Sequence, residues 1–132
     1  MKKALIFMLV ITSLFLVSCD FDKAQAYGND FCTALLENNE VAKEFLHPNS
    51  KLNGEKFDEF IARLEKHNEI DFSQGGKTIN SSWNSCSYGV VWEAYKYEYI
   101  FEMFVGDKTI NMFVVIIDDS NGYGVYSFGI IE

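Results

Sequence analysis

The sequence predicts an α+β domain in which N-terminal helices pack on one face of a curved antiparallel sheet of about four strands, joined as a meander. Apolar residues recur at three- and four-residue steps between positions 29 and 67, as in helices. After position 76 the pattern changes to the alternation that is typical of strands. Helices that precede strands in this way favour the α+β class.

Three helices are expected before the sheet. Asn38 and Asn39 break the first helical stretch, and Asn39 followed by Glu40 is typical of a cap that opens a second helix. Pro48 ends this second helix, because proline disfavours the helical conformation in the residue before it. A third helix is expected over residues 55–67. Its apolar stripe consists of Phe57, Phe60, Ile61 and Leu64.

Four strands are expected, over residues 77–86, 92–105, 109–117 and 123–131. In the second of them the odd positions are apolar and the even positions include Lys96, Glu98 and Glu102, which is typical of an antiparallel sheet packed on one side. The third strand is apolar on nearly both faces. We therefore expect its second face to be covered by a homodimer through the sheet, by a partner protein or by a rolled sheet.

The first nineteen residues predict export. Two lysines precede an apolar run over residues 4–17, and the small residue Ser18 precedes Cys19. A charged start, an apolar middle and small residues before the cut are the features of a cleaved export signal. The run of fourteen residues is shorter than the roughly 20 that span a bilayer. An uncleaved anchor and an ordinary secretory signal are the alternatives.

The sequence Leu16-Val17-Ser18-Cys19 resembles the lipobox of bacterial lipoproteins. This resemblance implies that diacylglycerol alkylates the Cys19 thiol, that the chain is cut before Cys19 and that the new amino group is acylated. The acyl chains would then anchor the protein in the bacterial cell envelope, on the periplasmic or the surface side. Asp20 resembles the inner-membrane retention signal of enterobacterial lipoproteins.

Three segments are therefore expected along the chain. They are a signal peptide at residues 1–18, a lipidated tether at 19–27 (or a direct lead into a helix), and a single α+β domain at 28–132. Loss of the two lysines of the signal peptide takes the formal charge from −8 to −10. Such an acidic domain repels phosphate backbones, so no nucleic acid is expected as a partner. The charge favours a basic protein partner, and solubility is the plainer explanation.

The three cysteines divide into one lipid attachment site and one pair. With Cys19 alkylated, Cys32 and Cys86 remain in an oxidising compartment, where an even remainder predicts one disulfide. Two separate buried thiols are the alternative. A catalytic thiol is not expected, because no neighbouring histidine or lysine would lower the pKa of either.

No catalytic residue, metal site or cofactor is assigned. Residues 74–78 end like a phosphate-binding loop, but Asp71 stands where that loop needs a glycine, and a strand follows instead of a helix. Residues 118–121 lack the alternating acids and the distal glutamate of a calcium loop. His47 and His67 have no zinc spacing, and both are expected to cap helix ends.

An aromatic set is the most interesting candidate for a pocket. It consists of Trp83, Tyr95, Tyr97 and Tyr99. Aromatic side chains of this kind fill the interiors of α+β proteins, so one interpretation is that they form core. The other is that the tyrosine hydroxyls line a cavity between sheet and helices that holds a small ligand.

The helical region also carries a spacing that is similar to the opening of nuclear-transport-factor-two-like domains, the cystatin-like α+β roll. The positions are Phe31, Ala34, Leu35, Asn38, Ala42, Phe45, Leu46 and Pro48. The resemblance would cover about residues 28–131 and implies a strongly bent sheet. Members of this family include isomerases, dehydratases and domains without chemistry, and no motif here lets a catalytic acid or histidine be carried across.

Together these observations predict a non-enzymatic, lipid-anchored envelope protein that binds another protein or a ligand. An acidic inhibitor or immunity-type protein that neutralises a basic enzyme is one example. The alternatives are a structural or assembly factor that acts through the sheet face, and an enzyme with a cone-shaped pocket for a small ligand.

Overall fold

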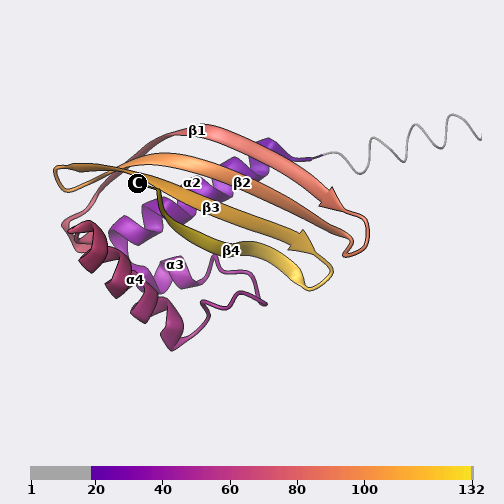
Figure 1. Ribbon diagram of the computed structural model, residues 1–132, viewed down its shortest axis with the longest axis horizontal. Coiled ribbons are helices and arrows are strands. Elements are labelled where there is room, and N and C mark those ends of the chain that lie inside the picture. The colour runs from indigo at the N-terminus through magenta and orange to yellow at the C-terminus, as the bar shows by residue number, and fades with distance from the viewer. Residues whose placement is uncertain (1–18, 132) are drawn as a thin grey trace, which may run out of the picture.

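The described part of the chain combines helices with a four-stranded sheet (Figure 1). The computed structural model describes residues 19–131, so the expected signal peptide at residues 1–18 lies outside the described residues. The helices are α2 (Phe21–Glu37), α3 (Asn39–Lys43), α4 (Glu55–Asn68) and the 3-10 turn η1 (Phe72–Gln74). The strands are β1 (Gly76–Gly89), β2 (Ala94–Val105), β3 (Lys108–Asp119) and β4 (Gly122–Ile131).

The strands pair in the order β1-β2-β3-β4, and each is antiparallel to the next. The α+β class, the antiparallel meander and the presence of one disulfide are thus confirmed. The sheet is open rather than closed, since β1 and β4 form its two edges.

Helix α2 begins earlier than the sequence predicts. Asp20 is its N-cap, and its side-chain Oδ1 accepts a hydrogen bond from the backbone N–H of Lys23 at 3.1 Å. Ala24 is already fully buried. Residues 21–27 are therefore the first turns of the longest described helix, and the expected tether at 19–27 is wrong. The alternative, a direct lead into a helix, is what the structure shows.

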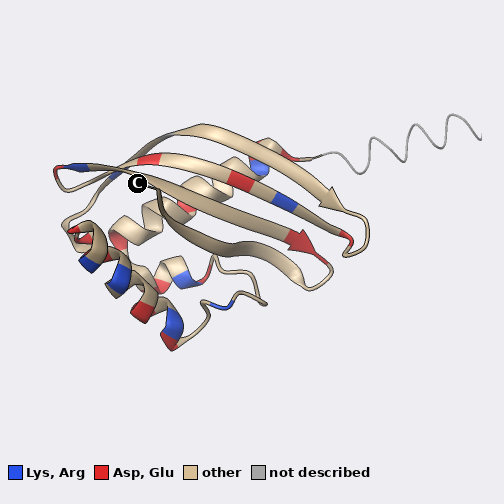
Figure 2. Ribbon diagram, viewed as in Figure 1, with Lys and Arg blue, Asp and Glu red and all other residues tan. Residues whose placement is uncertain are grey.

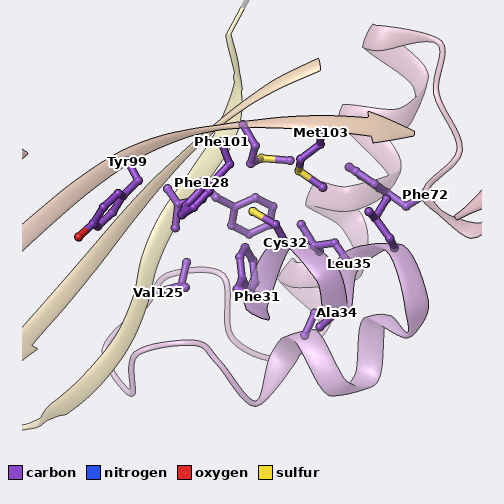
Figure 3. Close-up of a cluster of buried hydrophobic side chains, with 14 of the residues drawn as sticks. Phe31, Cys32, Ala34, Leu35, Phe72, Tyr99, Phe101, Met103, Val125 and Phe128 are labelled. Carbon is purple, nitrogen blue, oxygen red and sulfur yellow. The ribbon is translucent and has the colours of Figure 1, made fainter. Parts of the chain in front are cut away.

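The core lies between α2 and the odd-numbered residues of β2, which are buried from Tyr97 to Val105 as their alternation predicts. Figure 3 shows side chains of α2 pointing toward rings from the strands. The ring centroids of Phe31 in α2 and Phe128 in β4 lie 5.0 Å apart. Gly28 brings the α2 backbone close to the sheet, because a Cβ there would lie 2.8 Å from the ring of Phe101.

Strand β1 departs from regular pairing at two places. Its register against β2 shifts between Thr78 and Asn80 and again between Ser81 and Trp83. Each one-residue shift changes which face of the sheet the following side chains occupy. Without the second shift Trp83 would lie opposite Tyr99, but in the structure it pairs with Ile100.

The loop that follows α3 is bonded to β4. The N–H of Val125 donates to the carbonyl of Phe45 at 2.7 Å, and the N–H of His47 donates to the carbonyl of Val125 at 2.9 Å. These bonds form a parallel bridge between Leu46 and Val125. The approach requires glycine at position 124, because a Cβ there would lie 2.5 Å from the backbone nitrogen of His47.

Replacing Gly124 with alanine should therefore lower the free energy of unfolding by about 1–3 kcal/mol, as overpacking does elsewhere. The matched control is Gly129→Ala in the same strand, where a Cβ would meet no heavy atom within 4 Å. We expect that variant to stay within about 0.5 kcal/mol of the parent. Urea unfolding measures both, and equal effects would contradict the role given to Gly124.

Candidate functional site at the start of helix α2

The start of α2 is linked to strand β1 by a disulfide between Cys19 and Cys86, whose Cα atoms lie 6.3 Å apart. The predicted disulfide between Cys32 and Cys86 is therefore wrong. Cys32 lies thirteen residues beyond Cys19, mostly along a helix that rises 1.5 Å per residue, which places it about 20 Å away. A disulfide needs Cα atoms less than about 7 Å apart, so Cys86 cannot reach both.

Cys32 is instead a free thiol that is fully buried in the core. Burial raises the pKa of this thiol well above its usual value, which makes it a poor nucleophile. A signal for this was present in the sequence, because Cys32 lies between Phe31 and Leu35 on the apolar stripe of the helix. A count of cysteines alone takes no account of this position.

Two of the tyrosines predicted as pocket residues connect α2 to β2. The hydroxyl of Tyr97 accepts a hydrogen bond from the backbone N–H of Asp20 at 2.9 Å. The hydroxyl of Tyr99 donates one to the carbonyl of Phe21 at 2.8 Å. Burial raises the pKa of Tyr99 to about 12, so this hydroxyl keeps its proton and remains a donor at neutral pH.

The structure does not bring the four predicted pocket residues together. Tyr95 and Tyr97 stack with ring centroids 6.3 Å apart, and both lie with Tyr99 on the core side. Trp83 is exposed and pairs with Ile100, whose side chain points to the opposite face of the sheet, since neighbouring strand residues alternate. The three tyrosines are therefore better described as core residues than as the lining of a cavity shared with Trp83.

A groove that the sequence reasoning missed lies between α2 and the sheet. It has a volume of about 360 Å³. Its lining consists of Asp22, Gln25, Ala26 and Asn29 from the helix and Ile79, Ser81 and Phe101 from the strands. The helical members recur at three- and four-residue steps, which places them on one face. A carboxylate flanked by amides and a hydroxyl accepts hydrogen bonds, so this groove suits a basic side chain.

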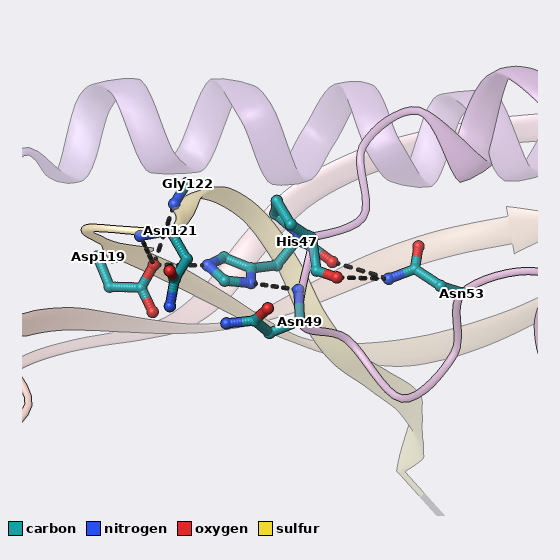
Figure 4. Close-up of polar contacts among 7 residues, drawn as sticks. His47, Asn49, Asn53, Asp119, Asn121 and Gly122 are labelled. Atoms are coloured by element: carbon teal, nitrogen blue, oxygen red, sulfur yellow. Dashed lines mark hydrogen bonds and ion pairs between the residues drawn. The ribbon is translucent and has the colours of Figure 1, made fainter.

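The ring of His47 is held by hydrogen bonds to a loop and a turn (Figure 4). The prediction that His47 caps a helix end is wrong. Its Nε2 donates to Oδ1 of Asp119 at 2.9 Å, and its Nδ1 accepts the backbone N–H of Asn49 at 3.0 Å. The same Asp119 oxygen accepts the N–H groups of Asn121 and Gly122. These bonds connect the loop after α3 to the β3–β4 turn and engage both ring nitrogens. His67 lies in the last turn of α4, where it was expected.

Burial of Asp119 acts to raise its pKa, but hydrogen bonds from His47 and from the two backbone N–H groups outweigh burial and lower it. Within residues 19–131, no cluster of three or more His, Cys, Asp or Glu side chains is arranged to hold a metal ion. None of the helices in this part of the chain is both long and apolar enough to cross a membrane. Comparisons of the chain with protein-family models, curated proteins and solved structures gave no match.

The lowered pKa of Asp119 predicts an acid-dependent contribution to stability. Its ionised form is favoured by folding, so the contribution is present above the ordinary pKa of 3.8 and is lost as the pH falls through the lower folded value. Asp119→Asn keeps the shape and removes the charge. We expect it to cost about 1 kcal/mol near neutral pH and progressively less below pH 4. Chemical unfolding across this range measures the difference, and a difference that does not vary with pH would contradict the assignment.

Proposed function

We propose that this chain is an exported lipoprotein that is anchored through Cys19 and that binds a basic protein at the envelope without catalysing a reaction. The position of Cys19 at the edge of the fold carries the proposal. The next residue, Asp20, already caps α2 and is hydrogen-bonded to Tyr97. A cut before Cys19 would therefore leave every described helix and strand intact.

A lipid on Cys19 would hold the domain directly against the bilayer, because no spacer separates Cys19 from α2. Several acyl chains give stable anchoring where a single chain does not. A net charge of −10 after removal of the signal peptide gives no general attraction to anionic lipid, so the acyl chains would supply the anchoring. The resemblance of Asp20 to an inner-membrane retention signal supports placement at the inner membrane.

The lipid and the disulfide compete for one sulfur atom. Alkylated Cys19 cannot also bond to Cys86, so in the anchored form Cys86 would be a free thiol beside the lipid. The disulfide joins residues 67 positions apart, so it cannot form until the chain as far as Cys86 has been exported, whereas alkylation needs only the segment around Cys19. Cys19 belongs to the leading segment of the chain, so we propose that alkylation precedes folding and excludes the disulfide.

The charge distribution on α2 supports a basic partner. The helix carries three exposed acids, Asp22, Asp30 and Glu37, against one lysine, Lys23. Figure 2 shows that α4, by contrast, carries both signs of charge along its length and that the strands are mostly uncharged. Asp22 also lines the groove beside β1. Complementary charge would steer a basic protein toward this helix.

The interior supports a non-enzymatic role. Apart from tyrosines, the buried polar residues among residues 19–131 are His47 and Ser50. Both are engaged by structural partners, His47 as described above and Ser50 through a hydrogen bond from its Oγ to the carbonyl of Tyr126 at 2.8 Å. Neither faces the acidic groove beside α2.

We also propose that the helices share one face of the sheet, as in nuclear-transport-factor-two-like domains. One residue of β4 supports this arrangement. The ring of Phe128 lies 5.0 Å from that of Phe31 in α2, and 5.8 and 5.0 Å from those of Phe57 and Phe60 in α4. Because one side chain contacts both helices, α2 and α4 lie on the same side of β4.

A specific observation favours a second candidate function. Trp83, Ile100 and Phe113 form one row across β1, β2 and β3 on the face away from the core. Ile117 lies on the same face further along β3 and is half-buried, whereas Val115 between Phe113 and Ile117 is buried. An assembly factor or a homodimer would use such a surface, as the apolar character of the third strand predicted.

The anchor is tested by the mass of the mature protein isolated from bacterial membranes and by labelling with radioactive palmitate. We expect a chain that starts at a lipidated Cys19, and loss of both label and membrane retention in Cys19→Ser. A maleimide should label Cys86 in the folded, anchored protein, whereas Cys32 should react only after unfolding because it is buried. A mature chain that keeps Met1, or an intact Cys19–Cys86 disulfide, would contradict the proposal.

Binding to a basic partner is tested by pull-down from envelope extracts at low and high salt, since salt screens exposed charges. Neutralising α2 with Asp22→Asn, Asp30→Asn and Glu37→Gln should abolish capture of a basic protein.

The matched control removes the same charge from exposed acids elsewhere, with Glu55→Gln, Glu59→Gln and Asp107→Asn. Equal loss in both triple variants would rule out a site on α2. Capture that survives neutralisation and is lost in Phe113→Ser would favour the second candidate function.

A further inference from the structure

The turn between β1 and β2 differs in composition from the other turns of the sheet. The β2–β3 turn uses Gly106 and Asp107, and the β3–β4 turn uses Ser120 and Asn121, which are residue types that favour turns. The β1–β2 connection consists of Val90, Val91, Trp92 and Glu93.

The three apolar residues of this turn are also the most exposed large apolar side chains of the described chain. Val90, Val91 and Trp92 are 77%, 85% and 79% exposed. A run of three exposed apolar residues is unfavourable in water unless another surface covers it. At the tip of a long hairpin these side chains bury little of their surface against the rest of the chain, so an external surface is the natural partner.

The hairpin tip and Cys19 lie at the same end of the molecule. Figure 1 shows the start of α2 and the β1–β2 connection on the same side of the view. The Cα atoms of Cys19 and Cys86 are 6.3 Å apart. Four residues of strand separate Cys86 from Val90, a distance of about 13 Å at the usual rise. The tip is therefore within one short strand segment of the proposed lipid.

Aromatic rings connect the two features without a break. The ring of Phe21 lies 6.2 Å from that of Tyr97, Tyr97 lies 6.3 Å from Tyr95, and Tyr95 lies 4.6 Å from Tyr88. Phe21 and Tyr88 are both exposed at the ends of this series. With the three tip residues they make five of the nine exposed large apolar side chains in residues 19–131. Aromatic residues concentrate in this way where proteins meet the membrane–water interface.

We propose that the tip of the β1–β2 hairpin, Val90 to Trp92, is a membrane-docking element that enters the bilayer interface beside the lipid on Cys19. This inference rests on the proposed anchoring function. The absence of a spacer before α2 supports a bilayer as the occupant, because the lipid would hold the tip within reach of the membrane. Glu93 follows the tip and would sit among the headgroups, which favours zwitterionic over anionic lipid.

The chain's two tryptophans allow a direct test, since Trp83 and Trp92 are the only ones in the sequence. The full-length gene is expressed in bacteria, and the processed protein is reconstituted into phosphatidylcholine vesicles whose acyl chains carry bromine, a contact quencher of tryptophan fluorescence. Trp83→Phe reports on the tip, and Trp92→Phe is the matched control that reports on the outer face of the sheet. Flotation of the vesicles measures anchoring in the same samples.

We expect the emission of Trp92 to be quenched at least two-fold and shifted to shorter wavelength, and that of Trp83 to change little. Val90→Ser with Val91→Ser should weaken the quenching of Trp92. Flotation without quenching of Trp92, or equal quenching of both tryptophans, would overturn the docking role and leave the anchor standing. Protection of Trp92 from aqueous acrylamide without quenching by lipid would assign the tip to a second copy and also overturn it. Failure to float would overturn the anchor and the docking role together.

Discussion

Two hydrogen bonds from tyrosine side chains fix the point at which the folded domain begins. Tyr97 accepts the N–H of Asp20 and Tyr99 donates to the carbonyl of Phe21, across 77 and 78 residues of sequence. A buried polar group that loses its partner costs about 1–3 kcal/mol, so these contacts hold the first turn of α2 against β2. The same contacts determine where the chain before Asp20 leaves the domain, and hence where a lipid on Cys19 would lie.

The fold could be predicted because periodicity alone determines which side of each element faces the core. The odd residues of β2 are buried from Tyr97 to Val105, and Phe57 and Ile61 are buried in α4, all as their spacing requires. The observed ends of the strands differ from the predicted ends where the local backbone geometry is irregular. Strand β2 begins at Ala94 and not at residue 92, because the preceding Glu93 has a positive φ of 49° and belongs to the turn.

The candidate site could be predicted only in part, because it depends on irregular features and on contacts between distant segments. A register shift before Trp83 moves that ring to the outer face, and a bulge of this kind has no reliable signal in one sequence. The groove beside α2 is lined by Asp22 from the helix and Ser81 from β1, which only folding brings together. Cys86 bonds to Cys19 and not to Cys32 because α2 is long and separates Cys32 from the sheet edge where Cys86 lies.

A lipid in place of the disulfide at Cys19 would change the chemistry of the junction and leave its tyrosine hydrogen bonds available. The Asp20–Tyr97 and Phe21–Tyr99 hydrogen bonds involve no sulfur atom, so they would hold the start of α2 beside β2 without the disulfide as well. The ring contacts from Phe21 through Tyr97 are likewise independent of the disulfide. An alkylated Cys19 would consequently extend its lipid from the end of the sheet that presents Val90 and Trp92. Asp22, in the first turn of α2, would then lie close to the bilayer, where a basic partner drawn to the membrane surface would encounter it.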